Sequence, residues 1–173
     1  MDQQAQRLRD GIVERLPELR RFCFALTGAA HAADDLMQST VERLLAKGVP
    51  DDADLTKWMF RVCKNIWIDE IRARRVRGPH TDPDALDSIA SIDGERAVMG
   101  RIALGEVHAA MDRLPEEQRL VLALVALEGR SYREAAEILE TPVGTVMSRL
   151  ARARRAVAEM LADSSASATA IGK

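Results

Sequence analysis

Residues 131–155 read SYREAAEILETPVGTVMSRLARARR, and this stretch decides the fold of the second half of the chain. Ser131 and Glu134 have the S-x-x-E spacing of a capping box, which predicts a helix that begins just after Ser131. The segment TPVG at 141–144 ends that helix, and Thr145 begins a second one. Two helices joined by a short turn that contains glycine predict a helix-turn-helix.

The second helix of this pair has an apolar face and a polar face. Helical spacing places four apolar side chains on the core side, namely Val146, Leu150, Ala153 and Val157. The opposite face offers two hydroxyl and two guanidinium groups, from Thr145, Ser148, Arg152 and Arg155. Such a helix can contact phosphates and base edges in a major groove, although an arginine-rich helical hairpin without a DNA partner would have the same pattern.

The residues around this motif divide the chain into two helical domains. Helical patterns over 105–114 and 115–128 precede the motif, so a C-terminal domain is predicted over 105–162, followed by a disordered tail over 163–173. Earlier patterns over 4–26, interrupted near Pro17, over 30–47 and over 54–75 predict an N-terminal domain over 1–75. Residues 76–104 lose the periodicity and are predicted to be a flexible linker that leaves the domain spacing undefined.

The composition predicts an all-α fold for both domains. The chain has 173 residues, of which 47% are hydrophobic and only 3% aromatic, and strands favour more aromatic and β-branched residues. No apolar run approaches the roughly 18 residues of a membrane span, so we expect a cytoplasmic protein. Cys23 and Cys63 lie in apolar helical patterns and are predicted to be buried thiols. The scattered histidines predict no metal site, and no cofactor is expected.

Two basic segments in a chain of net charge −2 predict two contacts with a polyanion. Residues 57–77 carry seven basic and two acidic side chains, a net charge of +5, and residues 141–158 carry four arginines and no acid. Concentrated positive charge of this kind is typical of nucleic-acid binding.

The helix predicted over 54–75, with Asp54 as its N-cap, combines this charge with aromatic residues. Its core stripe is Leu55, Met59, Val62 and Ile66. The opposite face holds Lys57, Arg61, Lys64, Arg72 and Arg75, with Asn65 beside it. Trp58, Phe60 and Trp67 either pack between helices or stack on the bases of a single strand, and the spacing alone leaves both interpretations open.

At this point a family resemblance is evident. Residues 114–155, LPEEQRLVLALVALEGRSYREAAEILETPVGTVMSRLARARR, closely resemble the C-terminal DNA-binding domain of bacterial sigma factors of the extracytoplasmic-function group. The segments DDLMQSTV at 34–41 and WMFRVCKN at 58–65 look like the polymerase-binding helix and the promoter-melting helix of the same group. The resemblance covers residues 8–160, and it identifies the chain as a two-domain transcription initiation factor.

The resemblance implies partners and site residues. Core RNA polymerase would bind through its clamp coiled coil and flap, and the residues implied for polymerase binding are Asp34, Asp35, Gln38 and Glu42. The residues implied for the minus-ten element and melting are Lys57, Trp58, Arg61, Lys64, Asn65 and Arg72. Those implied for the minus-thirty-five element are Thr145, Ser148, Arg149, Arg152 and Arg155. Promoter DNA, both duplex and single-stranded, and an anti-sigma protein are the other implied partners. Met147 departs from the family, where Lys or Arg is frequent, and this affects the expected promoter sequence.

Two other classes compete with this interpretation. A stand-alone helix-turn-helix regulator would use only the C-terminal domain on DNA, and would bind a palindrome as a dimer. An all-α enzyme would need a catalytic group facing the carboxylates near Asp34. The sequence offers no second acidic cluster, histidine base or glycine loop there, so no enzymatic activity is expected.

Overall fold

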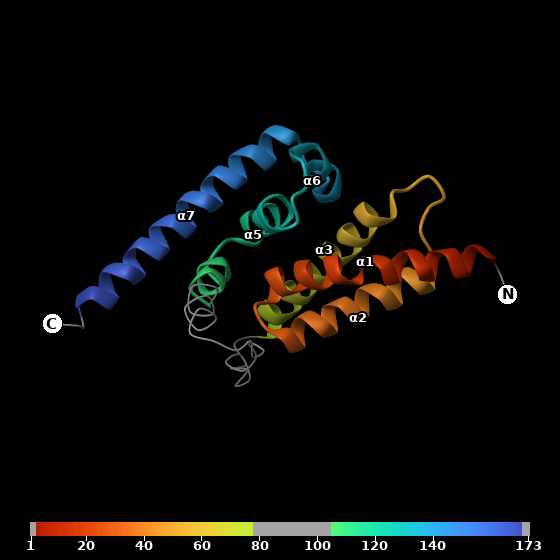
Figure 1. Cartoon of the computed structure of the whole chain (residues 1–173), viewed down its shortest axis with the longest axis horizontal. Helices are drawn as coiled ribbons and strands as arrows, with labels where there is room; N and C mark the ends of the chain where they lie inside the picture. The colour runs from red at the N-terminus through yellow and green to blue at the C-terminus, as the bar shows by residue number, and fades with distance from the viewer. Residues whose placement is uncertain (1–2, 78–104, 171–173) are drawn as a thin grey trace.

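The computed structural model describes residues 3–77 and 105–170, with side chains as far as residue 163 in the second range. Within these ranges every regular element is a helix, which confirms the predicted all-α class (Figure 1). The N-terminal module holds α1 (Gln3–Thr27), α2 (Ala30–Lys47) and α3 (Leu55–Arg77). The C-terminal module holds a helical stretch over 105–112, α5 (Glu116–Leu122), η1 (Ala123–Leu127), α6 (Tyr132–Leu139) and α7 (Val143–Ala170).

The three N-terminal helices pack around one apolar core. Phe22 of α1 and Phe60 of α3 are both fully buried, and their rings meet edge to face with centroids 4.8 Å apart. Met59 and Ile66 of the predicted core stripe are buried, while Leu55 and Val62 are partly buried. Trp67 is buried as well. Of the two interpretations that the sequence left open, packing between helices therefore holds for Phe60 and Trp67, and base stacking does not.

Glycines follow the ends of α1 and α2, and a capping aspartate precedes α3, as the sequence predicted. Gly28 and Gly48 follow α1 and α2 with φ of 75° and 73°, a left-handed conformation that favours glycine. The Asp54 carboxylate accepts a hydrogen bond of 2.9 Å from the backbone N–H of Lys57 and so caps α3. The interruption predicted near Pro17 is wrong, because α1 is continuous through it. Pro17 is exposed, as is Val13 one turn before it, so water can satisfy the carbonyl that loses its partner.

The C-terminal module contains the predicted helix-turn-helix. The Ser131 hydroxyl accepts from the backbone N–H of Glu134, and the Glu134 carboxylate accepts from the backbone N–H of Ser131, which completes the capping box. α7 begins at Val143, two residues earlier than predicted, and buries Val146, Leu150 and Ala153. α7 also continues to Ala170, whereas the sequence predicted a disordered tail from residue 163. Extension of an existing helix needs no new nucleus, and this segment is rich in alanine.

The two modules pack against each other. Phe24 of α1 meets His108 edge to face at 4.5 Å, and buried residues of both modules form one continuous apolar cluster. Burial lowers the pKa of His108 and so favours its neutral ring. In this structure the two modules are therefore in direct contact, whereas the sequence predicts no fixed spacing between them. The predicted linker over 76–104 lies outside the described residues, except Val76 and Arg77, which end α3.

None of the helices in the described ranges has the length and hydropathy needed to cross a membrane.

Candidate nucleic-acid interface

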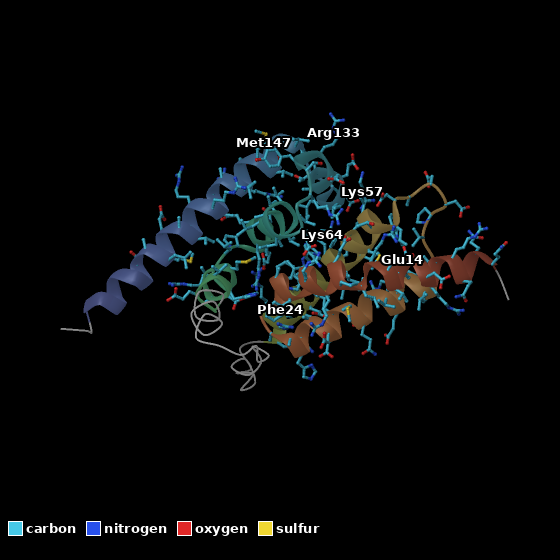
Figure 2. All side chains as sticks on the ribbon, viewed as in Figure 1. Glu14, Phe24, Lys57, Lys64, Arg133 and Met147 are labelled. Carbon is cyan, nitrogen blue, oxygen red and sulfur yellow. The ribbon has the colours of Figure 1, made fainter. Side chains whose placement is uncertain are left out.

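Three basic side chains of α3 form a row along the helix. Lys57, Arg61 and Lys64 are spaced i, i+4 and i+7, so they project from one face. Figure 2 shows Lys57 and Lys64 between α3 and the helices of the C-terminal module. The sequence predicted that this face is open to a nucleic acid. In the structure α6 covers it, and Lys64 is buried with 6% of its surface exposed.

Each of these cations has a partner in residues 137–140. Lys57 Nζ lies 2.5 Å from a carboxylate oxygen of Glu137, and this hydrogen bond raises the pKa of Lys57. Arg61 donates to the backbone carbonyl of Glu137 at 2.7 Å. Lys64 Nζ lies 3.1 Å from a carboxylate oxygen of Glu140 and donates to the backbone carbonyl of Ile138 at 3.4 Å.

The C-terminal part of α3 is more open. Arg72 and Arg75 are exposed, and Arg75 pairs with Glu116 of the C-terminal module. The predicted minus-ten set is therefore divided: three cations face α6, and Arg72 faces solvent.

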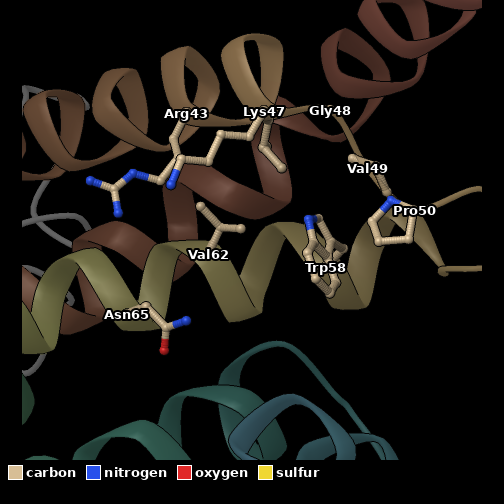
Figure 3. Close-up of a pocket in the computed structure, with 9 residues that line it drawn as sticks. Arg43, Lys47, Gly48, Val49, Pro50, Trp58, Val62 and Asn65 are labelled. Atoms are coloured by element: carbon tan, nitrogen blue, oxygen red, sulfur yellow. The ribbon is translucent and has the colours of Figure 1, made fainter.

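The two other residues of the set, Trp58 and Asn65, line a pocket of about 460 Å³ between α2 and α3. Figure 3 shows Arg43 and Lys47 extending from α2 into the space beside α3, with Trp58 at the Pro50 end and Asn65 at the other end, its amide directed away from α2. Both cations and Asn65 are exposed, and Trp58 is partly buried. The pocket thus combines positive charge, an aromatic ring and an amide, which are the groups that hold a phosphate and an unstacked base.

Sequence reasoning missed most of this pocket. Arg43 and Lys47 are spaced i, i+4 in the last turns of α2, and the segment GVP at 48–50 closes one end. A basic pair at the C-terminal end of a helix also complements the helix dipole. The spacing of Arg43 and Lys47 alone therefore did not indicate a binding site. Only the position of α2 against α3 shows that these cations and Asn65 share a site.

The residues implied for polymerase binding gather on the outer face of α2. Asp34, Gln38 and Glu42 are exposed and follow one another at intervals of four residues, with Asp35 beside them. Arg20 lies 2.7 Å from Asp34, and its hydrogen bond lowers the pKa of that carboxyl. Gln38 donates to Glu42 at 2.9 Å. This face is polar and mostly acidic, and the ion pairs and hydrogen bonds of its four residues join them to Arg20, to His31 and to one another.

The outward face of α7 is only partly as predicted. Ser148, Arg152 and Arg155 are exposed, and Thr145 is partly exposed. Arg149 turns away from this row and pairs with Glu117 at 2.6 Å, with 25% of its side chain exposed. Met147 is 52% exposed, and Figure 2 shows it at the outer surface near the start of α7. The described residues contain no group of metal-ligating side chains.

The chain is similar to known sigma-factor domains and proteins. The family described as sigma-70, region 4 matches residues 104–157, and the Sigma2 domain of PhyR matches residues 12–64. The chain is 36% identical over 156 residues to the ECF RNA polymerase sigma factor EcfG of Rhodopseudomonas palustris. The alignment covers 89% of this chain and 84% of that protein. It is 29% identical over 161 residues to SigW of Bacillus subtilis, with 84% of each chain covered.

Solved structures show the same fold. The sigma factor RpoE from Bartonella quintana, crystallised with the anti-sigma factor NepR, has a TM-score of 0.71 at 28% identity, over 88% of this chain and 95% of that chain. CnrH in complex with the cytosolic domain of CnrY has a TM-score of 0.68 at 23% identity. The two family matches thus cover parts of both halves of the chain. The chain belongs to the ECF family of RNA polymerase sigma factors, which are transcription factors and not enzymes.

Proposed function

We propose that this sigma factor binds core RNA polymerase, brings it to specific promoters and opens the DNA at the minus-ten element. The observation that carries the proposal is the pocket between α2 and α3, because its cations, indole and amide suit a nucleotide taken out of the stack. Extrusion of a base costs a few kcal/mol, which a site must offset by stacking and hydrogen bonding.

Within this proposal, Trp58 and Asn65 contact the extruded base and Arg43 and Lys47 hold the adjoining phosphates. The amide of Asn65 can both donate and accept, so it can distinguish one base edge from another. The cations supply the part of the affinity that depends on salt and not on sequence. Lys57, Arg61, Lys64 and Arg72 continue the positive charge along α3 and would follow the backbone of the same strand.

The α7 helix would read the minus-thirty-five element in duplex DNA. Thr145, Ser148, Arg152 and Arg155 provide hydroxyl and guanidinium groups on its outer face. Arginine can donate two hydrogen bonds to guanine, and a hydroxyl group can donate or accept a hydrogen bond. Met147 adds an apolar group to this surface, which suits the methyl group of a thymine.

Two protein partners complete the proposal. The acidic face of α2, formed by Asp34, Asp35, Gln38 and Glu42, would bind the clamp coiled coil of the polymerase, and the C-terminal module would bind the flap. An anti-sigma protein is proposed as the inhibitor, because the relatives RpoE and CnrH were solved with NepR and CnrY.

Run-off transcription with purified core polymerase tests this function. The protein and core together should produce transcripts from promoters selected from a DNA library, and neither alone should do so. Asn65→Ala should reduce transcription from duplex promoters more than from templates with a pre-melted minus-ten element. Transcription that depends on core polymerase but is unchanged by Asn65→Ala would support the sigma activity and contradict the proposed role of the pocket.

A further inference from the structure

The contact between α6 and α3 places acidic groups where the proposed function places DNA phosphates. Lys57 and Arg61 meet Glu137, and Lys64 meets Glu140, at distances of 2.5–3.1 Å. The three cations span two turns of α3, and the whole set of acceptors comes from residues 137–140. While α6 stays in place, Lys57 and Lys64 each pair with a carboxylate, and Arg61 is held by a backbone carbonyl.

The chemistry of the contact resembles that of a nucleic-acid backbone. Glu137 and Glu140 contribute carboxylates, and the carbonyls of Glu137 and Ile138 lie at the negative end of α6. These oxygen acceptors offer the cations hydrogen bonds of the kind that phosphates offer, and the two carboxylates add negative charge. Lys64 is the most buried cation, so its bond with Glu140 is screened least by salt.

Other contacts between the modules hold α6 in this position without using the proposed DNA row. Arg21 pairs with Glu128 at 3.1 Å, Arg130 pairs with Glu18, and Arg119 donates to the backbone carbonyl of Ala25 at 2.9 Å. The Arg119 guanidinium also lies over the ring of Trp67, 6.0 Å from its centroid. These groups dock α5 and η1 onto the first module, and α6 follows as their continuation.

We propose that residues 137–140 are an internal competitor of the promoter strand, so that this structure is a closed form of the sigma factor. The inference rests on the proposed function, because it takes the α3 row to be a DNA-binding surface. A strand and α6 cannot occupy Lys57, Arg61 and Lys64 at the same time. Opening the contact must therefore precede or accompany strand binding, and its free energy is subtracted from the apparent affinity for DNA.

Glu137 and Glu140 belong to the helix-turn-helix itself. The helix that precedes α7, the proposed reader of the minus-thirty-five element, therefore also covers part of the proposed minus-ten surface. A partner that moves the C-terminal module away from α3 would release this surface.

The double substitution Glu137→Gln and Glu140→Gln tests this competitor in the full chain. Both side chains are about half exposed, so their replacement by amides of the same size should leave the modules folded. We expect a larger radius of gyration in small-angle X-ray scattering without DNA. We also expect binding to a fluorescein-labelled single-stranded oligonucleotide of mixed sequence to become about threefold to tenfold tighter, the range that two partly exposed ion pairs provide.

The control is the pair Glu159→Gln and Asp163→Asn, which removes the same charge from exposed positions of α7. It should change neither the radius of gyration nor the affinity beyond the small effect of net charge. If the Glu137 and Glu140 variant matches this control in both measurements, the competitor is disproved while the sigma function stands. If the variant opens but binds the oligonucleotide no better than the control, the α3 row is not a DNA surface, and both the competitor and that part of the proposed function fail.

Discussion

Arg149 of α7 and Glu117 of α5 form an ion pair of 2.6 Å that joins the helix-turn-helix to the helix before it. Family resemblance assigned Arg149 to DNA together with its neighbours on the polar face. Only 25% of the Arg149 side chain is exposed, and its guanidinium pairs with a carboxylate of the same protein in this arrangement. Its position on α7 explains this, because Arg149 is at the edge of the polar face, beside the buried Ala153.

The first prediction is that Arg149 stabilises the C-terminal module. Arg149→Ala should lower the free energy of unfolding by about 0.5–1 kcal/mol, the range for a partly exposed ion pair. Thermal unfolding followed by circular dichroism measures this, and a double-mutant cycle with Glu117→Ala isolates the coupling. Additive effects of the two substitutions would show that the pair contributes nothing.

Arg152 should behave in the opposite way. It is exposed on the same helix, and no hydrogen bond or ion pair is seen for its side chain in the described part of the chain. Arg152→Ala should weaken promoter binding by the polymerase complex by about 1–3 kcal/mol if it contacts a base edge, with little change in the unfolding temperature. A loss of stability without a loss of binding per folded molecule would make Arg152 structural instead.

The pocket between α2 and α3 gives a third prediction. Asn65→Ala should spare binding to duplex minus-thirty-five DNA and reduce open-complex formation, followed by permanganate footprinting of unpaired thymines. Lys47→Gln is a matched test of the phosphate contact, and it should lower the salt dependence of open-complex formation without changing base preference. Equal loss of duplex binding and opening in Asn65→Ala would indicate misfolding.

The buried thiols give a prediction about pH. Cys23 and Cys63 are completely buried with their Sγ atoms 3.5 Å apart, and burial raises the pKa of Cys63 well above its ordinary value of 9.0. Above that value the unfolded chain loses the Cys63 proton while the folded chain keeps it. The folded state therefore binds more protons, and stability falls as pH rises.

This contribution is fully present below about pH 9 and is lost above it, with a limiting slope of about 1.4 kcal/mol per pH unit. Denaturant unfolding of the wild type and of Cys63→Ala between pH 8 and pH 10 measures the difference between the two slopes. The variant should be less stable at pH 8 and should lose stability less steeply. Parallel curves for the two proteins would contradict the assignment.

The helices and their buried faces could be predicted from the sequence because their signals are local. The Ser131–Glu134 capping box, the Asp54 cap and the Val146, Leu150 and Ala153 stripe each depend on residues within one or two helical turns. Pro17 misled the prediction for a related reason. A local rule ignores the packing of Ile12 and Leu19 in one core, which keeps both halves of α1 in a single helix.

The contacts of the candidate site could not be predicted in the same way. Lys57 and Glu137 are 80 residues apart, and nothing in the local pattern of either helix shows that they meet. The same holds for Arg43 and Asn65, which share a pocket only because α2 and α3 are packed together. The pattern of charges in a sequence identifies surfaces that favour anions. Whether such a surface meets a carboxylate of the same chain or an external phosphate depends on the tertiary structure.

Dependence on the polymerase is the central claim, and an electrophoretic mobility shift with a selected promoter duplex tests it most directly. The isolated protein should bind weakly and with steep salt dependence, because α6 covers its α3 row, and core polymerase should convert this into specific binding. Asp34→Lys with Asp35→Lys should abolish that gain, although the isolated protein should still bind DNA weakly. Tight, specific binding of a palindromic site by the protein alone, with no gain from core polymerase, would contradict the account and favour a stand-alone regulator.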